Sequence, residues 1–211
     1  MRAVSKVGRI AMILCVLVTG LSSSASAAPL GLSPNFPDIT AGFIMTAYNA
    51  STGDFSAVGS PASLFPTSNP ADEIPIGGTN PNYTIAGSFN NLTGAISGPS
   101  YLNILGNIAG GASDNVLLGG VIKNFGFNGP TVAQSSVLEF VIAVSGGLPA
   151  FGPYAGVILS QVKFGAANSD GISISYRGIS DNFAEVPEPG TLALLGFGLS
   201  AAAARRRKKQ L

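Results

Sequence analysis

The 211-residue chain has no histidine and no tryptophan, and its only cysteine is Cys15. Without histidine, Ser-His-Asp and Cys-His catalysis, histidine metal sites and zinc-hydrolase motifs are excluded. Because Cys15 lies in an N-terminal apolar run, the rest of the chain has neither a disulfide nor a reactive thiol. The sequence therefore predicts no catalytic residue, no metal site and no cofactor.

Charge is also scarce, at 10% of all residues. Between residues 28 and 186 the only cations are Lys123, Lys163 and Arg177. They stand against nine acidic side chains: Asp38, Asp54, Asp72, Glu73, Asp114, Glu139, Asp170, Asp181 and Glu185. A nucleic-acid interface needs several lysine or arginine side chains to neutralise phosphates, so we expect no nucleic-acid partner.

Residues 1–27 have the three regions of a secretory signal peptide. A basic start with Arg2, Lys6 and Arg9 is followed by the apolar run 10–21. Ala25 and Ala27 then supply the small residues of an A-x-A cleavage site. The apolar run is shorter than the about 20 residues of a membrane-spanning helix. We expect cleavage after Ala27 and export of the remainder.

The C-terminal segment 187–211 has the composition of a short membrane anchor. Val186, Pro187, Glu188 and Pro189 are followed by an uncharged run, residues 190–204. The chain then ends in a basic cluster: Arg205, Arg206, Arg207, Lys208 and Lys209. Fifteen helical residues span about 22 Å, against a hydrocarbon core of about 30 Å. We expect a short membrane helix with its cations on the cytoplasmic side, the alternative being the last helix of a soluble domain.

As a whole, this tail resembles the PEP-CTERM sorting signal. The resemblance covers about residues 186–209 and nothing upstream. It implies recognition of Pro187, Glu188 and Pro189 by an exosortase-type membrane protease that removes the tail. It further implies inner-membrane anchoring before processing, then a place at the cell surface or outside the cell. Proteins with this signal are common in bacteria that make exopolysaccharide and biofilm.

Residues 28–186 are long enough for one domain with a real core. Apolar residues alternate there with a period of two, and no helical stripe is found. We expect strands at residues 41–49, 54–58, 83–89, 95–97, 101–108, 115–127, 135–144, 156–164 and 172–177. A bulge is expected at Gly119-Gly120. This pattern predicts an all-β fold, either an antiparallel sandwich or an open barrel.

Two stretches of this domain are expected to lack strands. Residues 29–40 form an extended, proline-rich leader. Residues 59–82 contain five prolines and a Gly-Gly pair, which predict a long irregular loop with a short helical turn near residues 62–64.

Carboxylates are the only side chains left for acid–base chemistry. Glu139, in the most apolar strand, is the best single candidate for glycoside hydrolysis. It has no identifiable partner, so a solvent-facing position on the outside of the sheet is favoured, and a hydrolase is the remote alternative. Asp72 and Glu73 are expected to keep their loop soluble rather than bind an ion, and residues 168–171 to form a turn rather than a calcium loop.

The sequence thus predicts an exported structural or adhesive protein of the cell surface or extracellular matrix. The alternative is a glycan-binding module for which exopolysaccharide would be the partner. Its stacking platforms would be tyrosines, which otherwise serve as half-buried core residues: Tyr48, Tyr83, Tyr101, Tyr154 and Tyr176.

Overall fold

The computed structural model describes residues 28–111, 113–165, 172–175 and 179–184, and these consist mainly of antiparallel strands. The strands are β1 (Asp38–Asn49), β2 (Asp54–Phe65), β3 (Ile74–Pro75), β4 (Gly77–Ser88), β5 (Tyr101–Asn107), β6 (Asn115–Phe127), β7 (Leu138–Gly147), β8 (Tyr154–Ser160), β9 (Ile172–Ser175) and β10 (Ile179–Ala184). Three short 3-10 turns accompany them: η1 (Pro70–Asp72), η2 (Val132–Gln134) and η3 (Pro149–Phe151). The all-β prediction is confirmed, whereas the predicted signal peptide and C-terminal helix lie outside the described residues.

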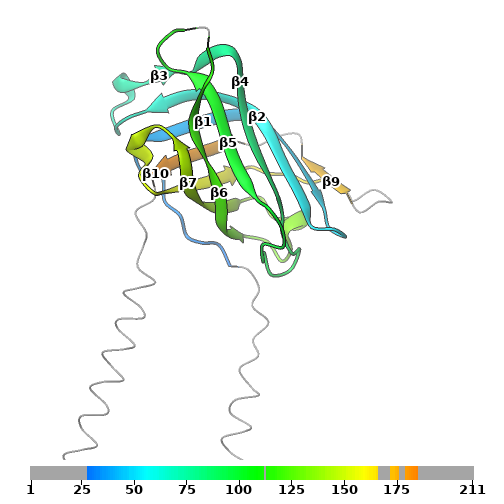
Figure 1. The fold of residues 1–211 in the computed structure, drawn as a ribbon. Coiled ribbons are helices and arrows are strands. Elements are labelled where there is room, and N and C mark those ends of the chain that lie inside the picture. Colours follow the sequence, from blue (N-terminus) through cyan, green and yellow to red (C-terminus); the bar gives the residue numbers. More distant parts are fainter. Residues whose placement is uncertain (1–27, 112, 166–171, 176–178, 185–211) are drawn as a thin grey trace, which may run out of the picture.

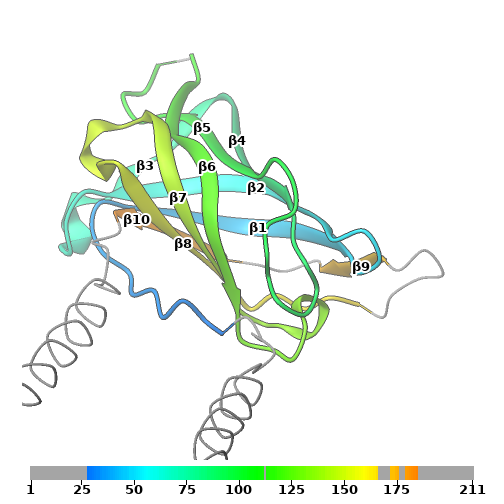
Figure 2. The ribbon, with the colours of Figure 1, turned by 60° about the horizontal axis from the view of Figure 1, so that its bottom comes forward.

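All of these strands belong to one curled sheet, shown in Figures 1 and 2. Hydrogen-bonded neighbours follow the order β3-β2-β4-β5-β6-β7-β8-β10-β1-β9, and β1 also pairs with β2. The first part of β1 pairs with β10 and its last part with β9. In the part of the chain that the structure describes, β10 pairs with β8 but β9 does not. The sheet is therefore joined at one end and open at the other. Of the two predicted architectures, the sandwich and the open barrel, the structure has the open barrel, in the form of a half-barrel.

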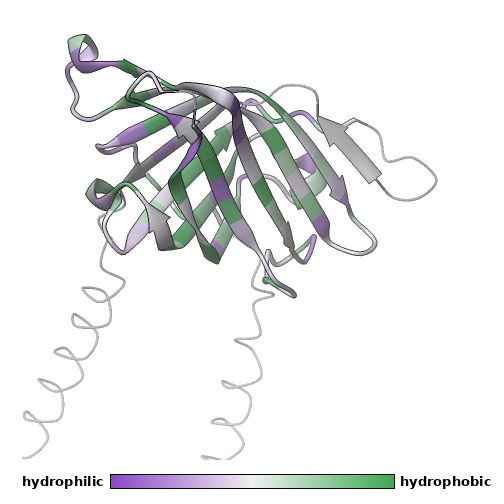
Figure 3. Ribbon diagram, turned by 45° about the horizontal axis from the view of Figure 1, so that its top comes forward, coloured by the Kyte–Doolittle hydropathy of each residue, from purple (hydrophilic) through white to green (hydrophobic). Residues whose placement is uncertain are grey.

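The curl of the sheet places an aromatic cluster in its interior. Successive side chains of a strand point to opposite faces, and Figure 3 shows hydrophobic and hydrophilic residues alternating along the strands. The ring of Phe140 has its centroid 5.8 Å from that of Phe55, 5.9 Å from Phe89 and 4.9 Å from Phe125. β2 and β7, which carry Phe55 and Phe140, are four pairing steps apart in the sheet. Their rings meet only because the sheet curls around them.

The predicted loop at residues 59–82 is wrong, because β2, β3 and β4 fill most of it, and residues 62–64 are strand rather than a helical turn. The prolines sit where no backbone donor is required. Pro61 lies beside the register shift between β1 and β2, and Pro75 lies in the two-residue strand β3. Pro81 falls within the register shift between β4 and β5.

Other expected strands agree better. β6 has the predicted bounds, and its pairing with β7 shifts register between Gly119 and Gly120, as predicted. β7 and β8 begin and end a few residues from the predicted bounds. The strand expected at residues 95–97 is reduced to one bridge between Phe89 and Ile96.

β10 was not predicted, because two of its inward positions are polar. Ser180 and Asn182 are both fully buried. The Asn182 amide donates to Ile39 O at 2.8 Å and to Ser180 Oγ at 3.0 Å. Ser180 Oγ also lies 2.7 Å from the hydroxyl of Tyr83. These hydrogen bonds replace apolar contacts where β10 joins β1.

Candidate functional site

Two adjacent rows of outward-facing side chains cross the sheet at right angles to its strands. Directly paired residues form the first row: Ala47, Ser56, Ala86, Tyr101, Val121, Ala143 and Tyr154. The second row consists of Met45, Val58, Thr84, Asn103, Gly119 and Gly146. Opposed Cβ atoms in antiparallel strands lie about 4.5–5.5 Å apart, so each row is a continuous strip. Neither strip contains a charged residue.

Tyr101 and Tyr154 are the only aromatic residues of the two rows. Their side chains are 47% and 43% exposed. Val121 and Ala143 lie between them in the row, which puts the two tyrosines three strand spacings, or about 14 Å, apart. Both rings are thus presented to solvent on one uncharged surface.

The other tyrosines take no part in this surface. Tyr48 and Tyr83 are fully buried, and their hydroxyls bond to Phe89 O at 2.8 Å and to Ser180 Oγ respectively. They are core residues and not stacking platforms, which were the two interpretations offered by the sequence. Tyr176 lies outside the described residues.

A shallow hollow of about 470 Å³ lies next to Tyr101. Gly119 and Gly146 are paired on β6 and β7, and because they have no side chain they leave its floor open. A Cβ atom built on Gly119 would lie 3.5 Å from Asn103 Oδ1, so this amide stands beside the floor. The Asn103 side chain makes no hydrogen bond within the ranges described above. The hollow therefore has one available amide, that of Asn103, and none of its lining residues is charged.

Asn103, Gly119 and Gly146 were not predicted as site residues. The sequence predicted a bulge at Gly119, and the strand predicted at residues 135–144 ended before Gly146. Whether the two glycines face each other depends on the β6–β7 register, which shifts at this bulge. The local signal was a pair of Gly-Gly steps in two strands that pair, Gly119-Gly120 within β6 and Gly146-Gly147 at the end of β7.

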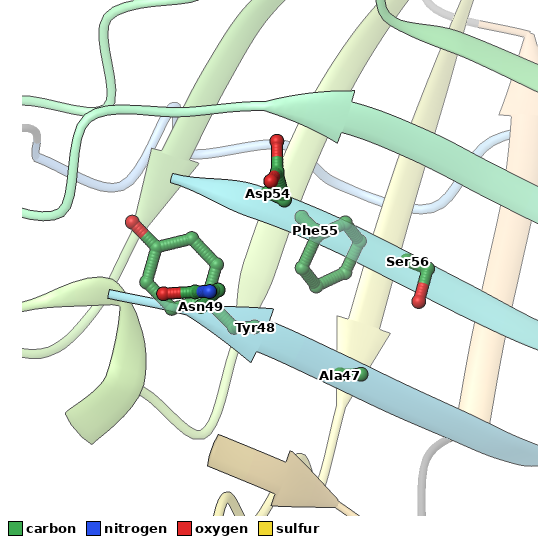
Figure 4. A pocket seen from close by; sticks show the side chains of 6 residues that line it. All are labelled: Ala47, Tyr48, Asn49, Asp54, Phe55 and Ser56. Carbon is green, nitrogen blue, oxygen red and sulfur yellow. The ribbon is translucent and has the colours of Figure 1, made fainter. Parts of the chain in front are cut away.

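A second hollow, of about 260 Å³, lies at the β1–β2 hairpin, as Figure 4 shows. Tyr48 and Phe55 line it, with Asn49 and Asp54 at the same end of the hairpin. Burial and the charge of Asp54 raise the pKa of Tyr48 to about 12. Asn49 Oδ1 accepts from the backbone of the turn, and Asp54 Oδ2 accepts from Thr52 Oγ1 at 2.7 Å. These polar groups serve the turn, so we assign this hollow no ligand.

Glu139 is not solvent-facing, and the favoured interpretation of this residue is wrong. It is only 6% exposed, because the leader covers this part of β6 and β7. The leader is residues 28–37, since β1 begins at Asp38 and not at residue 41 as predicted. The backbone N–H of Gly31 donates to Glu139 Oε2 at 3.0 Å. A Cβ atom on Gly126, which pairs with Glu139, would lie 2.7 Å from Ala28 O. Glu139 therefore holds the leader on the outside of the sheet.

The remaining acidic candidates bond to their own neighbourhood. Asp72 Oδ2 accepts from Thr67 Oγ1 at 2.6 Å, and Glu73 accepts from the hydroxyl of Ser63. No group of three or more potential metal-binding side chains occurs among the described residues. Residues 168–171, the other loop considered for calcium, lie outside them.

The described part of the chain is thus an antiparallel β-domain with an uncharged outer surface that carries two exposed tyrosines. The tail shows a sorting signal: residues 185–208 match the PEP-CTERM protein-sorting motif, which supports an exported protein targeted to exosortase. The match includes Pro187, Glu188 and Pro189 and most of the basic cluster. No curated protein and no solved structure matches the chain.

The predicted processing residues cannot be placed in the fold. Ala25, Ala27, the sorting motif and the basic cluster all lie outside the described residues. None of the helices within the described ranges is long and apolar enough to cross a membrane.

Proposed function

We propose that this chain is a non-catalytic protein of the cell surface or extracellular matrix whose β-domain binds polysaccharide. The binding surface is the tyrosine face, defined by Tyr101, Val121, Ala143 and Tyr154 with the adjoining hollow at Asn103, Gly119 and Gly146. The observation that carries the proposal is the pair of exposed tyrosines in one uncharged cross-strand row.

Sugar rings combine an apolar C–H face with hydroxyl groups, and the tyrosine face offers a partner for each. The C–H face packs on an aromatic ring, and the amide of Asn103 can donate to or accept from hydroxyls. A buried tyrosine contributes about 150–250 Å² of contact area. Covering the exposed halves of two rings would remove about 150–200 Å² from water, worth about 4–5 kcal/mol at 25 cal/mol per Å² before the costs of association.

Binding of this strength is weak for a single short glycan. A polymer offers many repeats to many copies of the protein, and linked contacts raise the overall avidity. Export and exosortase targeting support the proposal, because they bring the domain to the compartment where surface polysaccharide lies. The structural-protein prediction and the glycan-binding alternative thus become one function.

The hydrolase alternative receives no support from the geometry. Glu139 lies under the leader and is bonded to Gly31, so a substrate could not reach its carboxylate without displacing residues 28–31.

The proposal is tested by retention of the exported protein on polysaccharide prepared from the envelope of the producing cells. The wild type should be retained, and the double variant Tyr101→Ala/Tyr154→Ala should bind at least about tenfold more weakly, which corresponds to about 1.4 kcal/mol. Leu92→Ala is the matched control, since Leu92 is 61% exposed but lies in the turn after β4. Equal retention of wild type and double variant, or no retention of the wild type, would refute the proposed function.

A further inference from the structure

We infer that the glycan bound by the tyrosine face is uncharged and lies across the strands, from Tyr101 towards Tyr154, with one sugar in the hollow above Gly119 and Gly146. This inference rests on the proposed function and specifies its ligand class. Three observations carry it: the charges around the face, the direction of the row and the open glycine floor.

The charge distribution selects against an acidic polymer. Neither row contains a cation, and the one lysine of β6 is Lys123, an exposed residue two positions along the strand from Val121, within the register shift between Ile122 and Asn124. Residues 28–186 carry three cations against nine acidic side chains, so the domain as a whole repels polyanions. A uronate or phosphate group on the face would lose water without gaining an opposite charge, which is unfavourable. Sugar hydroxyl groups avoid this loss when they form hydrogen bonds with the Asn103 amide.

The direction follows from the pairing of the strands. Tyr101, Val121, Ala143 and Tyr154 lie directly opposite one another on β5, β6, β7 and β8. The small side chain of Ala143 leaves room for a chain to pass from one ring to the other. A glycan with this orientation meets two aromatic platforms about 14 Å apart.

The glycine floor gives a means of testing where the sugar lies. A Cβ atom on Gly146 would have Val116 Cγ1 as its nearest neighbour, at 4.0 Å, so a side chain there meets no clash. Gly146→Thr therefore fills the hollow with a residue suited to a strand. Gly42→Thr is its matched control, because Gly42 also lies in a strand with no atom within 4 Å and is outside both rows.

The experiment uses the exported protein and the producing cell's own surface polysaccharide, separated on an anion exchanger into neutral and acidic fractions. We expect retention on the neutral fraction that changes less than about twofold as salt is raised across the range in which the Debye length falls from about 10 Å to 3 Å. Gly146→Thr should weaken this binding at least about fivefold, and Gly42→Thr should leave it unchanged.

The outcomes separate this inference from the proposed function. Retention on the acidic fraction alone, decreasing with salt, would overturn the neutral ligand while polysaccharide binding through the tyrosines stands. Unchanged binding by Gly146→Thr would overturn the place of the sugar in the hollow. Failure to bind either fraction would remove the inference and the proposed function together.

Discussion

The contact between Phe55 and Phe140 provides a quantitative test of the curled sheet. Their ring centroids are 5.8 Å apart, although β2 and β7 are four pairing steps apart along the sheet. In a flat sheet, four strand spacings would separate them by about 19 Å. We expect Phe55→Leu and Phe140→Leu each to lower the free energy of unfolding by about 1–2 kcal/mol.

The informative quantity is the coupling between the two substitutions. Each single variant also loses contact with Phe89, but that loss cancels in a double-mutant cycle. An aromatic pair contributes about 0.5–1.5 kcal/mol beyond its buried area, so the double variant should be destabilised by less than the sum of the single variants by that amount. Urea unfolding followed by circular dichroism measures all four free energies of unfolding.

A control pair gives the coupling expected for two buried residues that are not in contact. Phe151 is equally buried and makes no ring contact with Phe55 in the described part of the chain. Substitutions of these two residues by leucine should be additive within about 0.3–0.5 kcal/mol. If Phe55 and Phe140 were equally additive, the two strands would not face each other across the core and the curl would be wrong.

Two further predictions concern the buried hydroxyl and the leader. The folded protein raises the pKa of Tyr48 from 10.0 to about 12. The contribution of this phenol to the free energy of unfolding should therefore be intact below pH 10 and lost as the pH rises towards 12, by about 1–2 kcal/mol with screening included. Tyr48→Phe should remove this part of the pH dependence of unfolding, and an unchanged profile would contradict the assignment. Gly126→Ala places a Cβ atom 2.7 Å from Ala28 O, so it should release the leader and speed its proteolysis with a loss of about 1 kcal/mol in stability, whereas equal protection of the leader in wild type and variant would show that it does not dock there.

Local pattern predicted some elements well and others not at all. The alternation in residues 115–127 and the Gly-Gly step within them were sufficient to predict β6 and its bulge. The prolines of residues 59–82 predicted a loop, because the sequence does not show that they fall at register shifts and in a short outer strand. β10 was missed because Asn182 occupies an inward position whose hydrogen bonds come from distant strands.

The tyrosine face was only partly predictable for the same reason. Tyrosine content identified Tyr101 and Tyr154 as candidates, together with Tyr48 and Tyr83, which are buried. Placing Tyr101 and Tyr154 in one outward row requires the register of three strand pairs, β5–β6, β6–β7 and β7–β8, and a shift of one residue in any of these would turn a ring to the other face. The sorting tail, in contrast, is a continuous motif, and its recognition at residues 185–208 needed no knowledge of the fold.

The intact mass of the exported protein tests exosortase processing most directly. In cells with a working exosortase we expect a chain that begins at Ala28 and ends close to Val186, because Pro187 and Pro189 keep the cleavage region extended. Replacing both prolines by alanine, or deleting the exosortase, should leave the tail in place. An exported product that still carries residues 205–211 in cells with active exosortase would contradict processing of this tail.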